Sequence, residues 1–200
     1  RQCLEVVEKH GFGLAILTKS VTILRDLDLL KAIHTKAKCV VQMTLTTYDE
    51  HLCRIIEPHV STTAERFAAL KEFRDAGIPT VVWLSPILPF INDTKENLLG
   101  ILEYCIEAKV HGILCFGFGM TLREGDREYF YAKLDEHFPG VKQKYIDTFG
   151  NAYSCNSKNN TFLYDIFQRE CRKHGILYRP NEVFEYLNRF ETNTEQLTLF

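Results

Sequence analysis

The sequence lacks several features that would assign it to a class directly. It has seven cysteines, an odd number, and no two of them are spaced as CxxC or CxxxC. This excludes a metal site formed by local cysteine spacing and argues against a secreted disulfide scaffold. The formal net charge is −2, so the composition gives no general electrostatic case for binding nucleic acid or an anionic membrane. No apolar run approaches the ~18 residues that span a bilayer, so no membrane partner is expected.

The cysteines that are present lie where buried thiols are expected. Cys39 precedes two valines, and Cys115 lies inside the apolar run 113–116. This pattern is typical of reduced thiols in a cytoplasmic protein. The seven histidines form no metal-ligand pair and there is no GxSxG elbow, so the residues alone assign neither a metal site nor a catalytic residue. The chain opens at Arg1 without an initiator Met or a signal peptide, and we expect it to be trimmed from a longer protein.

Four short apolar runs alternate with helical patterns in the first 120 residues. The predicted strands cover residues 13–18, 39–46, 80–84 and 113–116. Their near-continuous apolar character predicts a parallel sheet covered by helices. Thr62 and Glu65 stand at capping-box spacing, and Gly77 stands where a helix is expected to end. Residues 92–93 are expected to begin the next helix.

After Gly119 the pattern changes to helices, predicted at residues 125–138, 141–149, 161–174 and 181–190, with 176–178 as a candidate short strand. The predicted fold class is α/β. A partial parallel (β/α) barrel of about four units is expected over residues 1–120. A mostly helical extension (121–190) would pack on it, and a flexible tail (191–200) would follow. Eight such units would need about 250 residues, so the chain cannot hold a complete eight-stranded barrel.

Ligands of parallel α/β sheets bind beyond the carboxyl ends of the strands. The residues at or near these ends are Lys19, Ser20, Thr44, Thr46, Ser85, Pro86, Gly117 and Gly119. Thr44 and Thr46 share one face of their strand and could hold a ribose or a carboxylate, or cap the following turn. Lys19 could pair with a carboxylate or phosphate, serve as the Schiff-base lysine of another barrel enzyme such as an aldolase, or be an ordinary solvated lysine.

Several segments, taken in order, resemble one known family. They are Phe12-Gly13, 18–20, 24–30, 44–50, Glu57-Pro58, 61–66, 76–79, 85–89 and 91–93. Together they resemble the middle of the spore photoproduct lyase-like radical S-adenosylmethionine family, from about residue 10 to about residue 120. The resemblance implies a partial (β/α)₆ barrel in which a [4Fe–4S] cluster reductively cleaves S-adenosylmethionine to a 5′-deoxyadenosyl radical. It further implies a lyase that acts in DNA repair or nucleic-acid modification.

The family's CxxxCxxC cluster loop and its glycine-rich motif after the second strand are absent from this sequence. The resemblance therefore implies that both lie in an N-terminal part outside it, and that the strands here are the third to sixth. On this interpretation the chain alone neither binds iron nor cleaves the cofactor.

The same resemblance implies contacts with S-adenosylmethionine. Lys19 and Ser20 would meet the methionine carboxylate, and Thr44 and Thr46 the sugar or carboxylate. The remaining contacts would be Ser85, Pro86 and Asn92 on the far wall, and Gly117 and Gly119 near the adenine or the substrate.

The last five residues, Gln196-Leu197-Thr198-Leu199-Phe200, resemble the QLxLF peptide by which bacterial DNA repair and replication proteins dock on the sliding clamp. Leu199 and Phe200 would enter an apolar pocket, and Gln196 would supply an amide hydrogen bond; Leu197 completes the motif. Alternatively, the two apolar residues fold back on the domain. The tail also leaves open a non-catalytic clamp-binding module, and DNA is the second expected partner.

Overall fold

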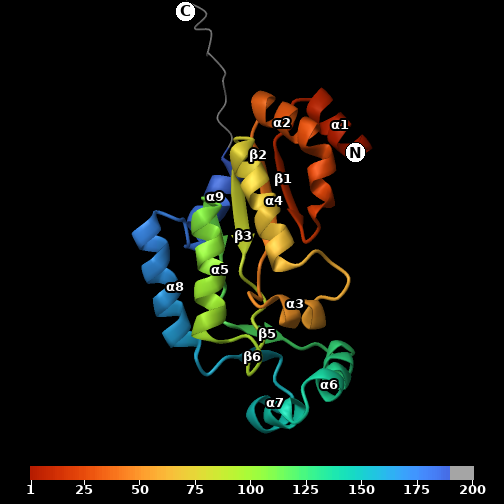
Figure 1. Cartoon of the computed structure of the whole chain (residues 1–200), viewed down its shortest axis with the longest axis vertical. Helices are drawn as coiled ribbons and strands as arrows, with labels where there is room; N and C mark the ends of the chain where they lie inside the picture. Colours follow the sequence, from red (N-terminus) through yellow and green to blue (C-terminus); the bar gives the residue numbers. More distant parts are fainter. Residues whose placement is uncertain (190–200) are drawn as a thin grey trace, which may run out of the picture.

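The computed structural model describes residues 1–189. Its main part is a four-stranded parallel sheet in the order β1-β2-β3-β4, which confirms the predicted α/β class (Figure 1). The strands are β1 (Leu14–Thr18), β2 (Cys39–Thr44), β3 (Thr80–Trp83) and β4 (Gly112–Leu114). All six residues of the inner strand β2 are buried, which explains its largely apolar sequence, with Gln42 and Thr44 buried as well. The candidate strand at 176–178 contributes one parallel bridge, between Leu177 and Gly112.

Helices and one short lobe surround this sheet. The helices of the main part are α1 (Gln2–Lys9), the 3₁₀ helix η1 (Val21–Asp26), α2 (Leu27–Lys36), α3 (Glu50–Ile56), α4 (Thr63–Asp75), α5 (Lys95–Glu107), α8 (Asn160–His174) and α9 (Pro180–Asn188). The lobe holds β5 (Gly119–Thr121), α6 (Asp126–His137), α7 (Val141–Phe149) and β6 (Ser154–Asn156). None of the helices formed by residues 1–189 is long and apolar enough to cross a membrane.

One face of the sheet carries the main core. Val41, Met43, Val82 and Ile113 point to this face and share a buried cluster with residues of α2, α4, α5 and α8. Figure 1 shows α4 and α5 side by side in front of the sheet. The alternation of side chains along each strand sends the intervening residues to the opposite face.

That opposite face is covered in part by α9. Val183 and Leu187 of α9 pack against Val40, Val81 and Leu114. Beyond this contact the face holds Leu17, Gln42, Thr44 and Trp83 from β1, β2 and β3, and Phe116 just after β4; we call these five residues the open face. Leu17 is 49% and Phe116 58% exposed. Apolar side chains of this size on the inner side of a half-barrel mark a surface that the described residues leave accessible.

The expected helix signals are confirmed in two places and shifted in one. Thr62 and Glu65 form a reciprocal capping box at the start of α4. Gly77 adopts a φ of +75° just after this helix. The helix expected to start at residues 92–93 instead begins at Lys95, with Thr94 as its cap. Asp93 is occupied elsewhere, since its Oδ2 accepts a 2.5 Å hydrogen bond from Ser157 Oγ.

The sequence predicted no strand between residues 119 and 156, and the lobe holds two. β5 and β6 pair in an antiparallel two-stranded sheet, with Gly119 opposite Asn156. A Cβ at Gly119 would lie 2.6 Å from the carbonyl oxygen of Cys155, so close strand pairing requires this glycine. The lobe has its own buried cluster of Leu122, Leu134, Tyr145 and Cys155.

The cysteines behave as the sequence predicts for buried thiols. All seven are free, and all except Cys3 are buried. Burial raises the pKa of Cys39 to about 12 and that of Cys115 to about 11. These thiols are therefore protonated side chains of the core at neutral pH.

Candidate functional site

The carboxyl ends of the four parallel strands meet at one edge of the sheet, as expected for a ligand site. Three charged side chains form a connected group there. Glu57 accepts hydrogen bonds from Lys19 (Nζ to Oε1, 2.5 Å) and from Arg66 (Nη2 to Oε2). The side chain of Arg66 is fully buried and that of Glu57 is 9% exposed, whereas that of Lys19 is 39% exposed. Of these three side chains, only that of Lys19 is substantially accessible to solvent.

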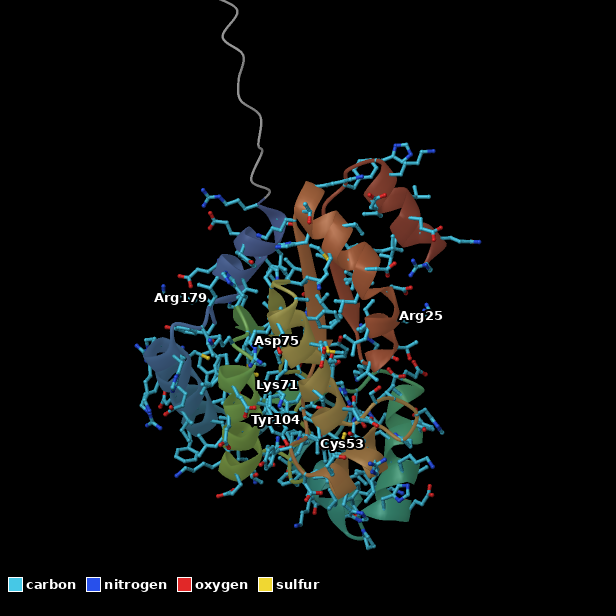
Figure 2. The ribbon with its side chains drawn as sticks, turned by 45° about the horizontal axis from the view of Figure 1, so that its top comes forward. Arg25, Cys53, Lys71, Asp75, Tyr104 and Arg179 are labelled. Atoms are coloured by element: carbon cyan, nitrogen blue, oxygen red, sulfur yellow. The ribbon has the colours of Figure 1, made fainter. Side chains whose placement is uncertain are left out.

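Arg66 holds this edge together from inside. Its Nη1 donates to the carbonyl oxygen of Thr44 (2.5 Å), and its Nε donates to that of Ser61 (2.7 Å). Its Nη2 also lies 3.9 Å from Sγ of Cys53, the thiol labelled in Figure 2. A buried guanidinium is tolerated here because a carboxylate and two carbonyl groups receive its hydrogens.

The ionisation of Glu57 follows from the same contacts. Burial disfavours its charged form, but the hydrogen bonds from Arg66 and then Lys19 outweigh burial, so the pKa of Glu57 lies below its usual value. The carboxylate is therefore charged at neutral pH and fixes the position of the Lys19 ammonium. A Schiff-base lysine needs a neutral amine in a desolvated site. The ion pair and partial exposure of Lys19 offer no support for the aldolase alternative.

Ser20 and the β2 threonines have local partners in the structure. Ser20 Oγ accepts a 3.2 Å hydrogen bond from the amide of Thr22 and caps η1. Thr44 and Thr46 are both buried, at 6% and 3% exposure. The carbonyl oxygen of Thr46 accepts hydrogen bonds from the side-chain amides of Asn92 (3.0 Å) and Asn97 (2.9 Å). These contacts join the loop after β2 to the loop after β3 and to the first turn of α5.

Asn92 is committed to this junction. Its Nδ2 also donates to Thr47 Oγ1 (3.0 Å), and its Oδ1 accepts from the amide of Leu88 (2.6 Å). Both of its amide hydrogens and its carbonyl oxygen are thus used within the protein. Ser85 and Pro86, joined by a cis peptide bond, follow β3 at the same edge.

The two glycines predicted after β4 serve different local purposes. Gly117 has a φ of +103°, a conformation that favours glycine, and Asn160 Oδ1 receives the next amide, that of Phe118, at 2.7 Å. Gly119 belongs to the strand pairing of the lobe. The structure thus brings Lys19, Thr44, Thr46 and the Ser85-Pro86 peptide to the carboxyl ends of the strands. Gly119 does not belong to this group, because it pairs with β6 in the lobe.

Site residues that the sequence did not single out lie on the open face. Trp83 Nε1 donates a 2.7 Å hydrogen bond to Gln42 Oε1, which fixes the indole over β2. Phe116 and Phe184 of α9 lie beside it, with ring centres 5.9 and 6.4 Å from that of Trp83. The two-residue alternation along β2 and β3 was the available signal, since it separates Gln42 and Trp83 from the core-facing positions.

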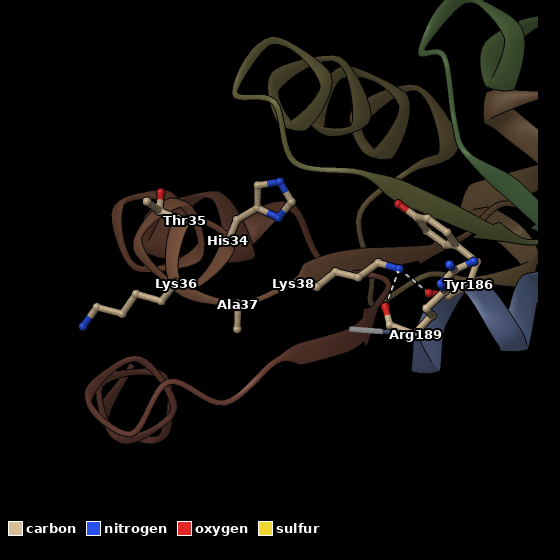
Figure 3. A pocket seen from close by; sticks show the side chains of 7 residues that line it. All are labelled: His34, Thr35, Lys36, Ala37, Lys38, Tyr186 and Arg189. Carbon is tan, nitrogen blue, oxygen red and sulfur yellow. Dashed lines mark hydrogen bonds between the residues drawn. The ribbon is translucent and has the colours of Figure 1, made fainter. Parts of the chain in front are cut away.

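A cavity of about 460 Å³ lies at the opposite edge, where the strands begin (Figure 3). Its lining is basic and comprises His34, Thr35, Lys36, Ala37, Lys38, Tyr186 and Arg189. Lys38 Nζ donates to the backbone carbonyl oxygens of Tyr186 and Arg189, as the dashed lines in Figure 3 indicate. This lysine therefore anchors the end of α9 and does not belong to the carboxyl-end site.

The resemblance implies an iron–sulfur cluster and S-adenosylmethionine, and the described residues suit the second better than the first. Within residues 1–189 no three His, Cys, Asp or Glu side chains gather as metal ligands, so the described residues provide no ligand set that fits an iron–sulfur cluster. The carboxyl-end edge does offer an oriented, partly exposed ammonium at Lys19, which can pair with the carboxylate of a zwitterionic nucleoside. The clamp-like peptide 196–200 lies outside the described residues.

No family model matches the chain. It is 30% identical over 139 residues to an uncharacterized protein of Mycobacterium tuberculosis, covering 70% of this chain and 40% of that protein. A protein of Acidianus two-tailed virus is 30% identical, with 68% and 45% coverage, and one of Methanocaldococcus jannaschii 34% identical, with 50% and 37%. The chain thus spans less than half the length of these relatives.

The comparison with solved structures gives two matches of different quality. A spore photoproduct lyase variant with bound AdoMet and dinucleoside spore photoproduct matches with a TM-score of 0.59 at 14% identity, over 88% of this chain and 54% of that one. Streptococcus suis SuiB bound to its precursor peptide SuiA gives a TM-score of 0.46 at 15% identity, over 84% and 36%. The first match shows that this chain shares its fold with about half of that lyase.

Proposed function

We propose that this chain forms the S-adenosylmethionine-binding part of a radical S-adenosylmethionine enzyme. The observation that carries the proposal is the backbone match to a lyase with bound AdoMet over 88% of the chain, at a TM-score of 0.59. The edge where Lys19 and Thr44 lie supports it, because this is where parallel α/β folds bind nucleotides. The cluster ligands are supplied from outside the described residues, and the chain without them is inactive.

The proposed role of Lys19 is to bind the methionine carboxylate. Glu57 orients the ammonium, and the exposed fraction of the lysine leaves it accessible to a ligand. The side chains of Thr44, Thr46 and Ser85 complete the polar part of the site, with Ser20, Pro86, Asn92 and Gly117 shaping its backbone, whereas Gly119 belongs to the lobe.

We propose a nucleic acid as the substrate, modified or repaired by a lyase-type reaction. The support is that the lyase structure that shares this fold holds a dinucleoside spore photoproduct. Docking on a sliding clamp through Gln196, Leu197, Leu199 and Phe200 is a separate proposal, tested by a pull-down with and without residues 196–200. Equal capture of both proteins would contradict it.

The main test uses the protein encoded by the complete gene, including any coding sequence that precedes residue 1. The protein is reconstituted with iron and sulfide without oxygen, reduced, and given S-adenosylmethionine. We expect the absorbance of a [4Fe–4S] cluster and release of 5′-deoxyadenosine. A complete protein that has no three-cysteine loop and releases no 5′-deoxyadenosine would overturn the proposal.

Ligand binding tests the role of Lys19 separately. We expect Lys19→Ala to weaken S-adenosylmethionine about ten- to hundred-fold, the range of a charge-assisted hydrogen bond, and to leave decarboxylated S-adenosylmethionine unaffected. The matched control is Lys71→Ala, because Lys71 lies on the helix-covered side in Figure 2 and pairs with Glu107 at the surface. An equal loss for both ligands would contradict a carboxylate contact.

A further inference from the structure

Three aromatic rings form one continuous wall over the carboxyl ends of β3 and β4. We define the aromatic wall as Trp83, Phe116 and Phe184. Their ring centres lie 5.9 to 6.4 Å apart. Phe116 and Phe184 are nearly parallel, at 30°, whereas the indole is inclined to both. The three residues come from β3, the segment after β4 and α9, so the fold and not a local sequence motif gathers them.

The wall is more exposed than packing of the sheet requires. Phe116 is 58% and Phe184 36% exposed, although neighbouring Val183 and Leu187 of α9 are buried against the sheet. Exposed large apolar groups cost solubility, so two exposed rings beside the half-buried Trp83 are a mark of a binding surface. Its shape favours a flat ring that stacks on or slides between the aromatic faces.

The polar group next to the wall matches a base edge. Gln42 is 7% exposed, and its Oε1 is held by the indole of Trp83. This hydrogen bond fixes the orientation of the amide and holds the carboxamide next to the indole of the wall. An oriented carboxamide is the side-chain group that pairs with hydrogen-bonding edges of nucleobases. No charged side chain belongs to the wall itself, which favours an uncharged ring.

The wall and Lys19 mark two different ends of the site. Lys19 follows β1, and Phe116 follows β4 at the other side of the four-stranded sheet. A methionine carboxylate bound by Lys19 places the cofactor toward β1 and β2. The aromatic wall then remains for a second molecule on the β3–β4 side.

We infer that the aromatic wall binds an unpaired nucleobase of the nucleic-acid substrate by stacking, with Gln42 beside its edge. This inference rests on the proposed function and adds the substrate subsite to it. The recognised chemistry is a flat, neutral, hydrogen-bonding ring of a single-stranded or everted nucleotide.

The test exploits Trp83, which is the single tryptophan of the 200-residue sequence. The complete protein and its Trp83→Phe variant are titrated with the dinucleotide thymidylyl-thymidine and with an abasic analogue of the same charge, while indole fluorescence is recorded; the quenching that the variant lacks is assigned to Trp83. We expect quenching by the dinucleotide and none by the abasic analogue. Phe116→Ala should weaken dinucleotide binding roughly 5- to 150-fold, the range for loss of one base–aromatic stack, and Phe116→Tyr should retain it.

The matched control is Phe12→Ala. Phe12 is 62% exposed and precedes β1, at the opposite edge of the sheet. We expect it to bind the dinucleotide like the unaltered protein. A loss in both alanine variants, or equal quenching by the abasic analogue, would overturn the inference.

Two further measurements distinguish binding of the cofactor from binding of the substrate. Saturating S-adenosylmethionine should leave the dinucleotide affinity within about twofold; competition would show that the wall holds the adenine of the cofactor and would overturn the inference. Calorimetry with S-adenosylmethionine alone reports on the proposed function. Cofactor binding without dinucleotide binding would overturn the inference about the aromatic wall and leave the proposed function standing. Dinucleotide binding without cofactor binding would overturn the proposed function and leave the aromatic wall as a base-binding surface.

Discussion

Glu57 is the carboxylate on which the buried arginine of this site depends. Its replacement by Ala leaves the fully buried Arg66 guanidinium facing a void in place of a negative charge. Removing one partner of a buried ion pair costs about 3 kcal/mol or more of unfolding free energy. We expect a loss of this size for Glu57→Ala in urea denaturation.

The control for this variant is Glu107→Ala, which breaks the surface pair with Lys71 at 3.2 Å. An exposed pair contributes little, and we expect its unfolding free energy to change by no more than about 0.5 kcal/mol. Equal losses in the two variants would show that burial of Arg66 does not set the cost.

The lowered pKa of Glu57 also predicts how stability depends on pH. A carboxyl whose pKa is lower in the folded state than its reference value of 4.5 stabilises the fold above that value. This contribution is lost as the pH falls through the folded-state pKa. The stability difference between the unaltered protein and Glu57→Gln should therefore be largest near neutral pH and shrink below pH 4.5. A difference that stays constant from neutral to acidic pH, measured by urea midpoints, would contradict it.

The packing of α5 against the loop after β2 depends on Gly100. A Cβ at this position would run into the ring of Tyr48. Tyr48 in turn contacts Tyr104, labelled in Figure 2, and that ring stacks on Phe67 of α4 with centres 4.1 Å apart. The glycine thus allows three aromatic rings to join α4, α5 and the loop that carries Thr46.

Gly100→Ala should consequently destabilise the protein although alanine favours helices. The gain in helix propensity is about 1 kcal/mol, and overpacking costs about 1–3 kcal/mol, so a net loss of about 1 kcal/mol is expected. The double variant Gly100→Ala/Tyr48→Ala removes the clash and should recover the propensity gain relative to Tyr48→Ala alone. Thermal unfolding of the four proteins gives the comparison, and a stabilising single substitution would disprove it.

The accuracy of the sequence-based prediction differs between elements for physical reasons. The strands β2 to β4 could be predicted because burial on both faces makes them largely apolar, β1 because it is a short apolar run although one face is exposed, and α4 because its capping box is a local signal. The strands β5 and β6 have three residues each and no repeating pattern, so they were missed. Their existence depends on the contact between Gly119 and Asn156, which are far apart in the sequence.

The candidate site shows the same division between local and distant information. Lys19 and Thr44 could be selected because they lie at or beside strand ends. The pairing of Lys19 with Glu57, and of Glu57 with Arg66, joins three separate segments and could not be derived from spacing. Likewise, the helix over 181–190 was predicted, but the sheet face that it covers was fixed only by tertiary packing.

The two outermost strands of the sheet, β1 and β4, differ in what lies along their free sides, and this difference bears on how the chain fits a larger protein. At the β4 edge the amide of Ile113 donates to Leu177 O (2.8 Å) and that of Leu177 to His111 O (3.1 Å). At the β1 edge Ala15 and Leu17 are exposed, and β1 pairs with β2 alone within residues 1–189. If the complete protein is a larger barrel, as proposed, its next strand must pair along β1.

Amide hydrogen exchange tests this placement directly. Because Leu14 donates to Lys38 and alternate amides of a parallel strand point in opposite directions, those of Ala15 and Leu17 point away from β2. In the 200-residue chain they should exchange much faster than the amide of Ile16, which faces β2. In the protein encoded by the complete gene, the amides of Ala15 and Leu17 should become as protected as that of Ile16. If these two amides stay fast in the complete protein while it cleaves S-adenosylmethionine, the barrel does not continue from β1, and the strands described here are not its third to sixth.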